Sequence, residues 1–223
     1  MRWKVERHVN GVESLHSLGV PESPQRVLRW CVPERSALVL GSTQPGADVD
    51  ALACKELDLD IVRRTSGGGA VLVQPEDLVW ADVFVPAQDR LWQHDVGHAF
   101  AWLGEAWATA LEATGIAGVE VHAGAMVKTR WSSKVCFAGL GPGEVTLAGR
   151  KVVGISQRRN RLGALFQCAA VRHLDVDRTL MALELSSSDR HELTIALEHL
   201  AVIDAGFDEA VLAEALETAL EAL

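Results

Sequence analysis

The run of three glycines at residues 67–69 most constrains how this chain can fold. It separates two apolar segments rich in β-branched residues, and Arg63, Arg64 and Ser66 stand just before it. Glycine lets a backbone approach a ligand closely and leaves its N–H groups unobstructed, so such a loop can wrap a carboxylate or phosphate. The guanidinium groups match the geometry of these anions. A flexible turn between two strands is the alternative explanation for the glycines alone.

Two common phosphate-binding patterns are absent, because the sequence has neither a GxxxxGK[ST] loop nor a GxGxxG motif. We therefore expect the loop to hold an anion or an acyl carbonyl in another way. A second basic feature lies downstream and indicates a local site for an anionic group in an otherwise acidic chain. It consists of Arg150, Lys151, Arg158, Arg159 and Arg161.

Composition limits the class of protein. The 223 residues are 48% hydrophobic, enough for a substantial core in one globular domain. A net charge of -9 argues against a nucleic-acid-binding function. Four cysteines without a CxxC pair or a histidine at metal-binding spacing indicate reduced thiols and no metal site. The charged N-terminus and the lack of a long apolar run predict a soluble, cytoplasmic protein that does not engage membranes.

Short apolar runs and alternating patterns predict strands separated by glycine-containing turns. Gly149 before Arg150 fits a hairpin turn, and the alternation around it indicates an antiparallel sheet. The predicted strands cover residues 36–41, 78–85, 134–140, 144–149, 150–159 and 164–171.

Helical spacing of apolar residues is weaker at residues 46–62 and clear from about Trp92 to Thr114, where Gly115 marks the end. Two further amphipathic helices are predicted within residues 186–203, after a serine cluster that can cap a helix, and within 207–223. This order of elements predicts an α+β fold in which helices cover a sheet.

Two motifs carry a resemblance to a known family. The stretch "RRTSGGGAV" at residues 63–71 resembles the signature loop of the lipoate-protein ligase and octanoyltransferase family, which is related to biotin-protein ligases. The stretch "GRKVVGISQRR" at residues 149–159 resembles the family strand that bears an active-site lysine, here Lys151. The spacing of about eighty residues between them and the upstream "ERSALVLGSTQ" also suit this family.

The resemblance covers roughly residues 30–175 and implies the biotin/lipoate ligase catalytic fold, which is class II-synthetase-like. That fold has a mostly antiparallel sheet flanked by helices. We expect residues 1–223 to form a single catalytic domain, with C-terminal helices at 176–223 and no separate accessory domain.

The resemblance also implies roles for individual residues. Lys151 would lie over the acyl carbonyl, where its charge stabilises the developing oxyanion or holds the phosphate of an acyl-adenylate. The residues implied to line the acyl or adenylate site are Arg63, Arg64, Ser66, Gly67, Gly68, Gly69, Ala70, Gly154 and Ser156. A solvent-exposed strand lysine is the alternative for Lys151. For Arg158, Arg159 and Arg161, a solvent-exposed edge and a docking patch for acidic carrier domains stay open.

The implied acceptor is a lysine on a lipoyl domain of a 2-oxoacid dehydrogenase or on a glycine cleavage carrier protein, and acyl carrier protein is the candidate donor. The substrate is lipoate or octanoate, and no covalently bound cofactor is expected. ATP and Mg are expected only if the protein is a ligase that proceeds through lipoyl-adenylate.

Three observations favour a cysteine-dependent octanoyltransferase over an ATP-dependent ligase. Cys136 precedes Lys151 by fifteen residues, where one class of octanoyltransferases carries its nucleophile. Gly143 and Glu144 replace the "ND" dipeptide of typical ligases. The chain also stops two helices after the sheet, without the accessory domain of typical bacterial ligases.

Several alternatives stay open. Cys136 is also explained as a buried core residue, and no histidine lies near it in sequence to activate it, which leaves Lys151 or Lys134 for that task. Phe166 and Gln167 stand where the family strand often carries histidines, and a second thiol, that of Cys168, follows. A ligase, a non-catalytic relative that binds lipoylated or biotinylated partners, and a biotin-protein ligase are the competing functions.

Overall fold

The computed structural model describes residues 2–223, and its core is a seven-stranded sheet. Neighbouring strands are antiparallel except for the parallel pair at one edge, β1 and β2. In spatial order, the strands are β1 (Lys4–Asn10), β2 (Val27–Pro33), β6 (Leu78–Pro86), β10 (Gly163–Val171), β9 (Arg150–Arg159), β8 (Val145–Leu147) and β7 (Val119–Val121).

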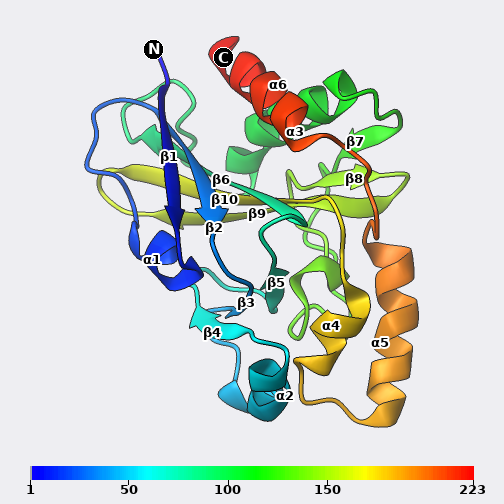
Figure 1. Cartoon of the computed structure of the whole chain (residues 1–223). Coiled ribbons are helices and arrows are strands. Elements are labelled where there is room, and N and C mark those ends of the chain that lie inside the picture. The colour runs from blue at the N-terminus through cyan, green and yellow to red at the C-terminus, as the bar shows by residue number, and fades with distance from the viewer. Residues whose placement is uncertain (1) are drawn as a thin grey trace.

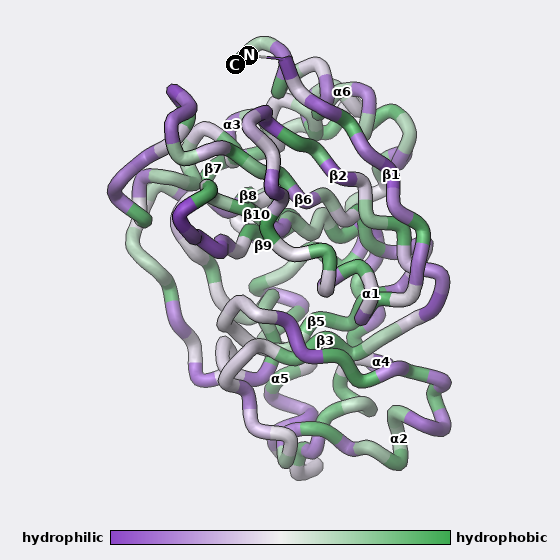
Figure 2. The backbone as a smooth tube through the Cα atoms, turned by 90° about the vertical axis from the view of Figure 1, so that its left-hand side faces the viewer, coloured by the Kyte–Doolittle hydropathy of each residue, from purple (hydrophilic) through white to green (hydrophobic). Residues whose placement is uncertain are grey.

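A second sheet of three strands lies against one face of the large sheet (Figures 1 and 2). Its central strand, β3 (Ala37–Leu40), runs parallel to β4 (Asp60–Arg63) and antiparallel to β5 (Val71–Val73). The glycine run lies in the connection from β4 to β5, residues 64–70. The small sheet therefore fixes both ends of the loop that carries the sequence signature.

Helices cover both faces of the large sheet (Figure 1). On one face, α3 (Ala101–Ala113) and α6 (Glu209–Glu221) pack over the central strands. On the other face, the small sheet shares a core with α1 (Val12–Ser17), α2 (Ala51–Glu56), α4 (Val176–Met181) and α5 (Ser187–Leu200). Three short 3-10 turns complete the chain: η1 (Gly46–Asp48), η2 (His98–Phe100) and η3 (Cys136–Ala138).

Strand β6 shows why the sheet is buried on both sides. Val79, Ala81 and Val83 contribute to the core under α3 and α6, whereas Leu78 and Trp80 face the core of the small sheet. Every residue of this strand is buried, so its sequence reads as a nearly continuous apolar run rather than an alternating one.

The predicted α+β fold is confirmed, as are the strands near 36–41, 78–85, 150–159 and 164–171. Gly115 ends α3 with a φ of +89°, the left-handed conformation that glycine adopts readily. The predicted C-terminal helices are also present. The side chains of Ser186 and Asp208 cap α5 and α6 by accepting backbone N–H bonds in the first turn of each helix.

The prediction of a helix from Trp92 is wrong, because α3 begins only at Ala101. The preceding segment forms turns in which Asp89 accepts a hydrogen bond from the Leu91 N–H and Asp95 accepts one from the His98 N–H. Short carboxylate side chains compete in this way with helical backbone bonds.

The prediction of a strand at residues 134–140 is also wrong, since Cys136–Ala138 forms the 3-10 turn η3. The edge strands β1 and β2 and the helix α1 have no counterpart among the predicted elements, which begin at residue 36. Throughout residues 2–223, no helix combines the length and apolar character needed to cross a membrane.

The packing of α6 leads to a prediction about stability. Leu216 is fully buried between α6 and the large sheet, so Leu216→Ala leaves a cavity and should lower the free energy of unfolding by about 2–5 kcal/mol. Val211→Ala is the matched control on the same helix, because Val211 is 46% exposed, and it should change stability by less than about 0.5 kcal/mol. Urea unfolding followed by circular dichroism measures both, and equal losses would contradict this packing.

Candidate active site

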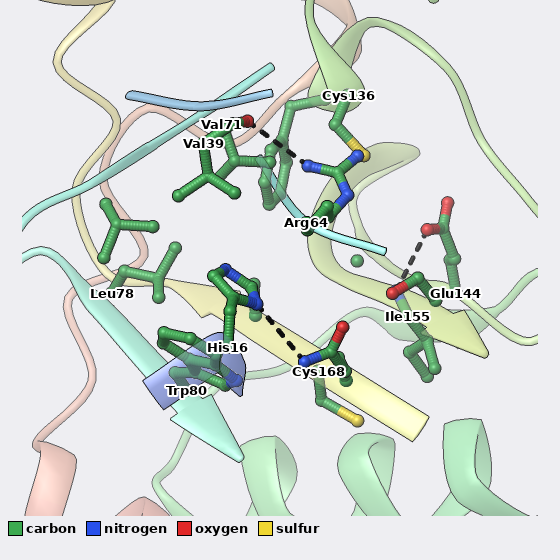
Figure 3. A pocket seen from close by; sticks show the side chains of 16 residues that line it. His16, Val39, Arg64, Val71, Leu78, Trp80, Cys136, Glu144, Ile155 and Cys168 are labelled. Atoms are coloured by element: carbon green, nitrogen blue, oxygen red, sulfur yellow. Dashed lines mark hydrogen bonds between the residues drawn. The ribbon is translucent and has the colours of Figure 1, made fainter. Parts of the chain in front are cut away.

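The candidate site is a largely apolar cavity between the two sheets (Figure 3). Strands β6, β9 and β10 form one wall, and β3 and β5 form the opposite wall. The space between these walls amounts to about 560 Å³, part of which is open to solvent. Its lining residues are His16, Val39, Arg64, Val71, Val73, Leu78, Trp80, Cys136, Phe137, Glu144, Gly154, Ile155, Ser156, Gln167, Cys168 and Ala169.

The glycine loop is held against the segment that carries Cys136. Ala70 donates a backbone hydrogen bond to the Lys134 carbonyl and accepts one from the Cys136 N–H, both at 2.9 Å. A Cβ on Gly69 would lie 2.6 Å from the Val135 backbone nitrogen, so only glycine permits this approach. Gly68 has a φ of +99°, a conformation that other residues rarely adopt.

Arg64 stabilises the loop from inside. Its guanidinium donates hydrogen bonds of 2.8 Å to the carbonyls of Gly67 and Gly69 and lies beside the Cys136 sulfur (Figure 3). Arg64 is 7% exposed, so its positive charge acts in a poorly solvated environment.

The other predicted residues of this loop lie outside the cavity lining. Arg63 points to the segment after β3, where it binds the carbonyls of Gly41 and Gln44 at 2.7 Å. Ser66 is buried, and its hydroxyl has no hydrogen-bond partner among residues 2–223. Gly67 is exposed, with open space around the position that a Cβ would take. Their predicted contacts with a substrate stay predictions.

Cys136 and Lys151 meet in space although they are fifteen residues apart. The Lys151 ammonium lies 4.0 Å from the Cys136 sulfur and donates hydrogen bonds of 3.2 Å to the Cys136 and Gly139 carbonyls. Lys151 is 2% exposed, whereas Cys136 is only half-buried. The structure therefore pairs a partly accessible thiol with a buried cation.

Glu144 completes this group. Its carboxylate forms an ion pair of 2.7 Å with Lys151 and accepts backbone N–H bonds from Gly141 and Ile155. Burial alone would lower the pKa of Lys151, but the negative charges of Cys136 and Glu144 outweigh it and raise this pKa above its usual value. Lys151 consequently stays protonated at neutral pH and serves as a fixed cation.

Gly154 and Ser156 lie on the β9 wall of the cavity. A Cβ on Gly154 would lie 3.2 Å from the Lys151 Cε and 3.5 Å from its Nζ. The missing side chain thus leaves the room through which Lys151 reaches Cys136. Ser156 lies two residues further along the same face of β9, opposite Gln167 of β10.

The second predicted thiol and the other predicted cations have different surroundings. Lys134 forms an ion pair of 2.7 Å with Asp48 and not with a group at Cys136. Cys168 lines the cavity on β10 but also packs in the core under α3 and α6, where burial raises its pKa. Arg159 stacks on Trp92, with the guanidinium carbon 4.8 Å from the ring centroid.

His16 and Glu144 are site residues that sequence reasoning missed. Burial, with a further contribution from the positive charge of Arg64, lowers the pKa of His16 to about 4, so this imidazole is neutral near pH 7. No local pattern identifies His16, because it reaches the cavity from α1. In the sequence, Glu144 was noted only as one of the two residues that replace the "ND" dipeptide of typical ligases. Across residues 2–223, no group of three or more His, Cys, Asp or Glu side chains is arranged to hold a metal ion.

Comparison with known sequences agrees with this geometry. The lipoyl protein ligase A/B catalytic domain matches residues 13–199. A relative from Carboxydothermus hydrogenoformans, named octanoyltransferase LipM, is 32% identical over 84% of this chain and 66% of its own length. A second octanoyltransferase LipM, from Clostridioides difficile, is 24% identical over 74% of this chain and 60% of its own. The chain therefore spans slightly less than two thirds of these relatives.

Solved structures share the fold. A bipartite lipoate protein ligase from Thermoplasma acidophilum superposes with a TM-score of 0.76 and 16% identity, over 99% of this chain and 82% of that chain. A lipoate-protein ligase A bound with ATP superposes with a TM-score of 0.73 and 18% identity, over 99% and 84%.

The close approach of Gly69 to the Val135 backbone, the clamp between the glycine loop and the Cys136 segment, can be tested with two glycines of the loop. Gly69→Ala places a Cβ against the Val135 backbone, and this overpacking should lower the free energy of unfolding by about 1–3 kcal/mol and slow alkylation of Cys136 by iodoacetamide. Gly67→Ala is the control, because nothing lies within 4 Å of its Cβ position, and it should leave both quantities near wild type. Similar behaviour of the two variants would refute the clamp.

Proposed function

This chain belongs to the lipoyl protein ligase A/B catalytic domain family, and on that premise we propose that it transfers an octanoyl or lipoyl group from a thioester donor to a lysine of a lipoyl carrier domain. The observation that carries the proposal is the Cys136 sulfur 4.0 Å from the buried Lys151 ammonium, beside an apolar cavity. The name octanoyltransferase LipM of two relatives supports the same reaction.

In the first step, the Cys136 thiolate attacks the carbonyl carbon of the donor thioester. A C–S bond forms to Cys136, and the carbonyl oxygen becomes an oxyanion whose charge Lys151 is placed to stabilise. The oxyanion then collapses and expels the donor thiolate, which takes a proton from water. The product is an acyl-enzyme, with the aliphatic tail against the apolar walls of the cavity.

In the second step, the uncharged ε-amine of the acceptor lysine attacks the acyl carbon. An amide bond forms, the C–S bond breaks, and the proton lost by the amine passes to the Cys136 sulfur. Lys151 again faces the developing oxyanion. It remains charged throughout because Glu144 and two backbone carbonyls stabilise its protonated form.

The central test combines donor, enzyme and intact-protein mass spectrometry. Octanoyl-acyl carrier protein should add one hydroxylamine-sensitive octanoyl group to the enzyme, and Cys136→Ser should abolish this adduct. Cys54→Ala is the matched control, because that thiol is buried in the core of the small sheet and does not line the cavity, and it should keep the adduct. Lys151→Ala should lower the rate of acylation by about 10²–10³, as the loss of one oxyanion donor does elsewhere.

Each outcome decides between functions. Formation of lipoyl-adenylate from lipoate and ATP without any acyl-enzyme would refute the cysteine route and favour a ligase that uses ATP and Mg. Full activity of Lys151→Ala with both substrates would contradict the whole assignment. Binding of a lipoylated domain without turnover of either donor would support a non-catalytic relative.

The arginines of the β9–β10 hairpin support an acidic carrier protein as partner. Arg158 lies two residues beyond Ser156, about 7 Å along the cavity-facing side of β9, and Arg161 lies in the turn. Both are exposed, and neither forms an ion pair with a carboxylate of residues 2–223. In a chain of net charge -9, this hairpin is where an acidic partner meets least repulsion.

We expect the double variant Arg158→Glu/Arg161→Glu to raise the KM for octanoyl-acyl carrier protein several-fold, mostly at low salt, because rim charges act on encounter. Acylation by a small octanoyl thioester should not change. Arg7→Glu is the matched control, since Arg7 is exposed on the other face of the sheet. An equal KM effect of all these charge reversals would contradict a local docking site.

A further inference from the structure

Two rings line the end of the cavity away from Cys136 (Figure 3). His16 from α1 packs over Trp80 from β6, with ring centroids 4.4 Å apart and planes inclined by 41°. The walls that lead from Cys136 to these rings are apolar and include Val39, Val71 and Leu78. The cavity is therefore a slot with a reactive end and an aromatic end.

A closed circuit of contacts fixes the two rings. The Trp80 Nε1–H donates a 2.7 Å hydrogen bond to Asp82, and the Gln167 amide lies 3.5 Å from the same carboxylate oxygen. The Gln167 amide nitrogen also lies 3.4 Å from His16 Nδ1, which the dashed line at His16 marks in Figure 3. The His16–Trp80 contact completes the circuit.

The sheet determines three of the four members of this circuit. Asp82 of β6 pairs directly with Gln167 of β10, so both side chains project on the cavity face at one level of the sheet. Trp80 precedes Asp82 by two residues on that face. His16 alone comes from outside the sheet, and its neutral ring suits an apolar wall because Nδ1 is free to accept the proton of the Gln167 amide.

We propose that His16 limits the length of the acyl chain that this enzyme accepts. The proposal rests on the acyl transfer through Cys136 and deepens it, because it names the residue that sets the accepted chain length. A chain attached to Cys136 runs along the apolar walls until its terminal methyl group meets the His16 ring. Because hydrogen bonding and stacking hold that ring, a longer chain must displace it and break the circuit.

The test compares rates of Cys136 acylation by thioesters of one small thiol that carry hexanoyl, octanoyl, decanoyl or dodecanoyl chains. His16→Ala removes the ring, so the decanoyl-to-octanoyl rate ratio should rise about tenfold, the factor expected from burying two more methylenes. His16→Trp adds bulk and should shift the preference towards hexanoyl. The two variants act in opposite directions, so misfolding of one leaves the other decisive.

Two controls separate ring volume from other effects. His16→Phe keeps a ring of similar size without the Gln167 hydrogen bond, so its decanoyl-to-octanoyl rate ratio should lie between those of the wild type and His16→Ala. Ser17→Ala, on an exposed neighbour in the same helix, should not alter the profile. An unchanged profile in both His16→Ala and His16→Trp, with wild-type enzyme acylated normally, would overturn the role of His16. Absence of any adduct on the wild-type enzyme would instead refute the proposed function.

Discussion

The rest of the site depends on the contacts that stabilise the buried ammonium of Lys151. A charge that is 2% exposed is costly unless polar partners replace its water, and here Glu144 and the carbonyls of Cys136 and Gly139 do so. Each partner needs its own support: two backbone N–H groups bind Glu144, and the absent side chain of Gly154 gives the lysine its path. The cation therefore dictates the conformation of residues 136–144 as well as that of β9.

The position of Cys136 follows from backbone contacts more than from its own side chain. Ala70 fixes the Cys136 N–H, and Gly69 permits the close approach that makes this bond possible. The turn η3 then directs the Cys136 carbonyl to Lys151. In the proposed reaction, the signature glycines therefore supply structure and no reactive atom: they join the small sheet to the turn that presents Cys136, the proposed nucleophile.

The sequence could predict what is local in the chain. The motifs identified the glycine loop and Lys151, and strand patterns located β6, β9 and β10. The sequence left open whether Cys136 and Lys151 are in contact. That contact depends on the turn η3, whose residues have an apolar composition typical of a strand. The predicted helix began too early, because Trp92 keeps helical spacing with the apolar residues of α3. In the structure, Asp89 and Asp95 accept backbone hydrogen bonds and fold that segment into turns. The sequence did not identify His16 as a site residue, because only tertiary packing brings α1 to the cavity.

The anion-binding groups that the sequence suggested are largely occupied within the protein. Arg63 binds two carbonyls away from the cavity. Arg64 uses Nη2 on the carbonyls of Gly67 and Gly69, whereas its buried Nε has no hydrogen-bond partner among residues 2–223. Lys151 keeps its positive charge and forms an ion pair with Glu144. A phosphate at this site would have to compete with these contacts, whereas a thioester needs only a nucleophile, one fixed cation and an apolar slot. The balance of satisfied charges thus supports the thioester of Cys136 over an adenylate as the group bound beside the glycine loop.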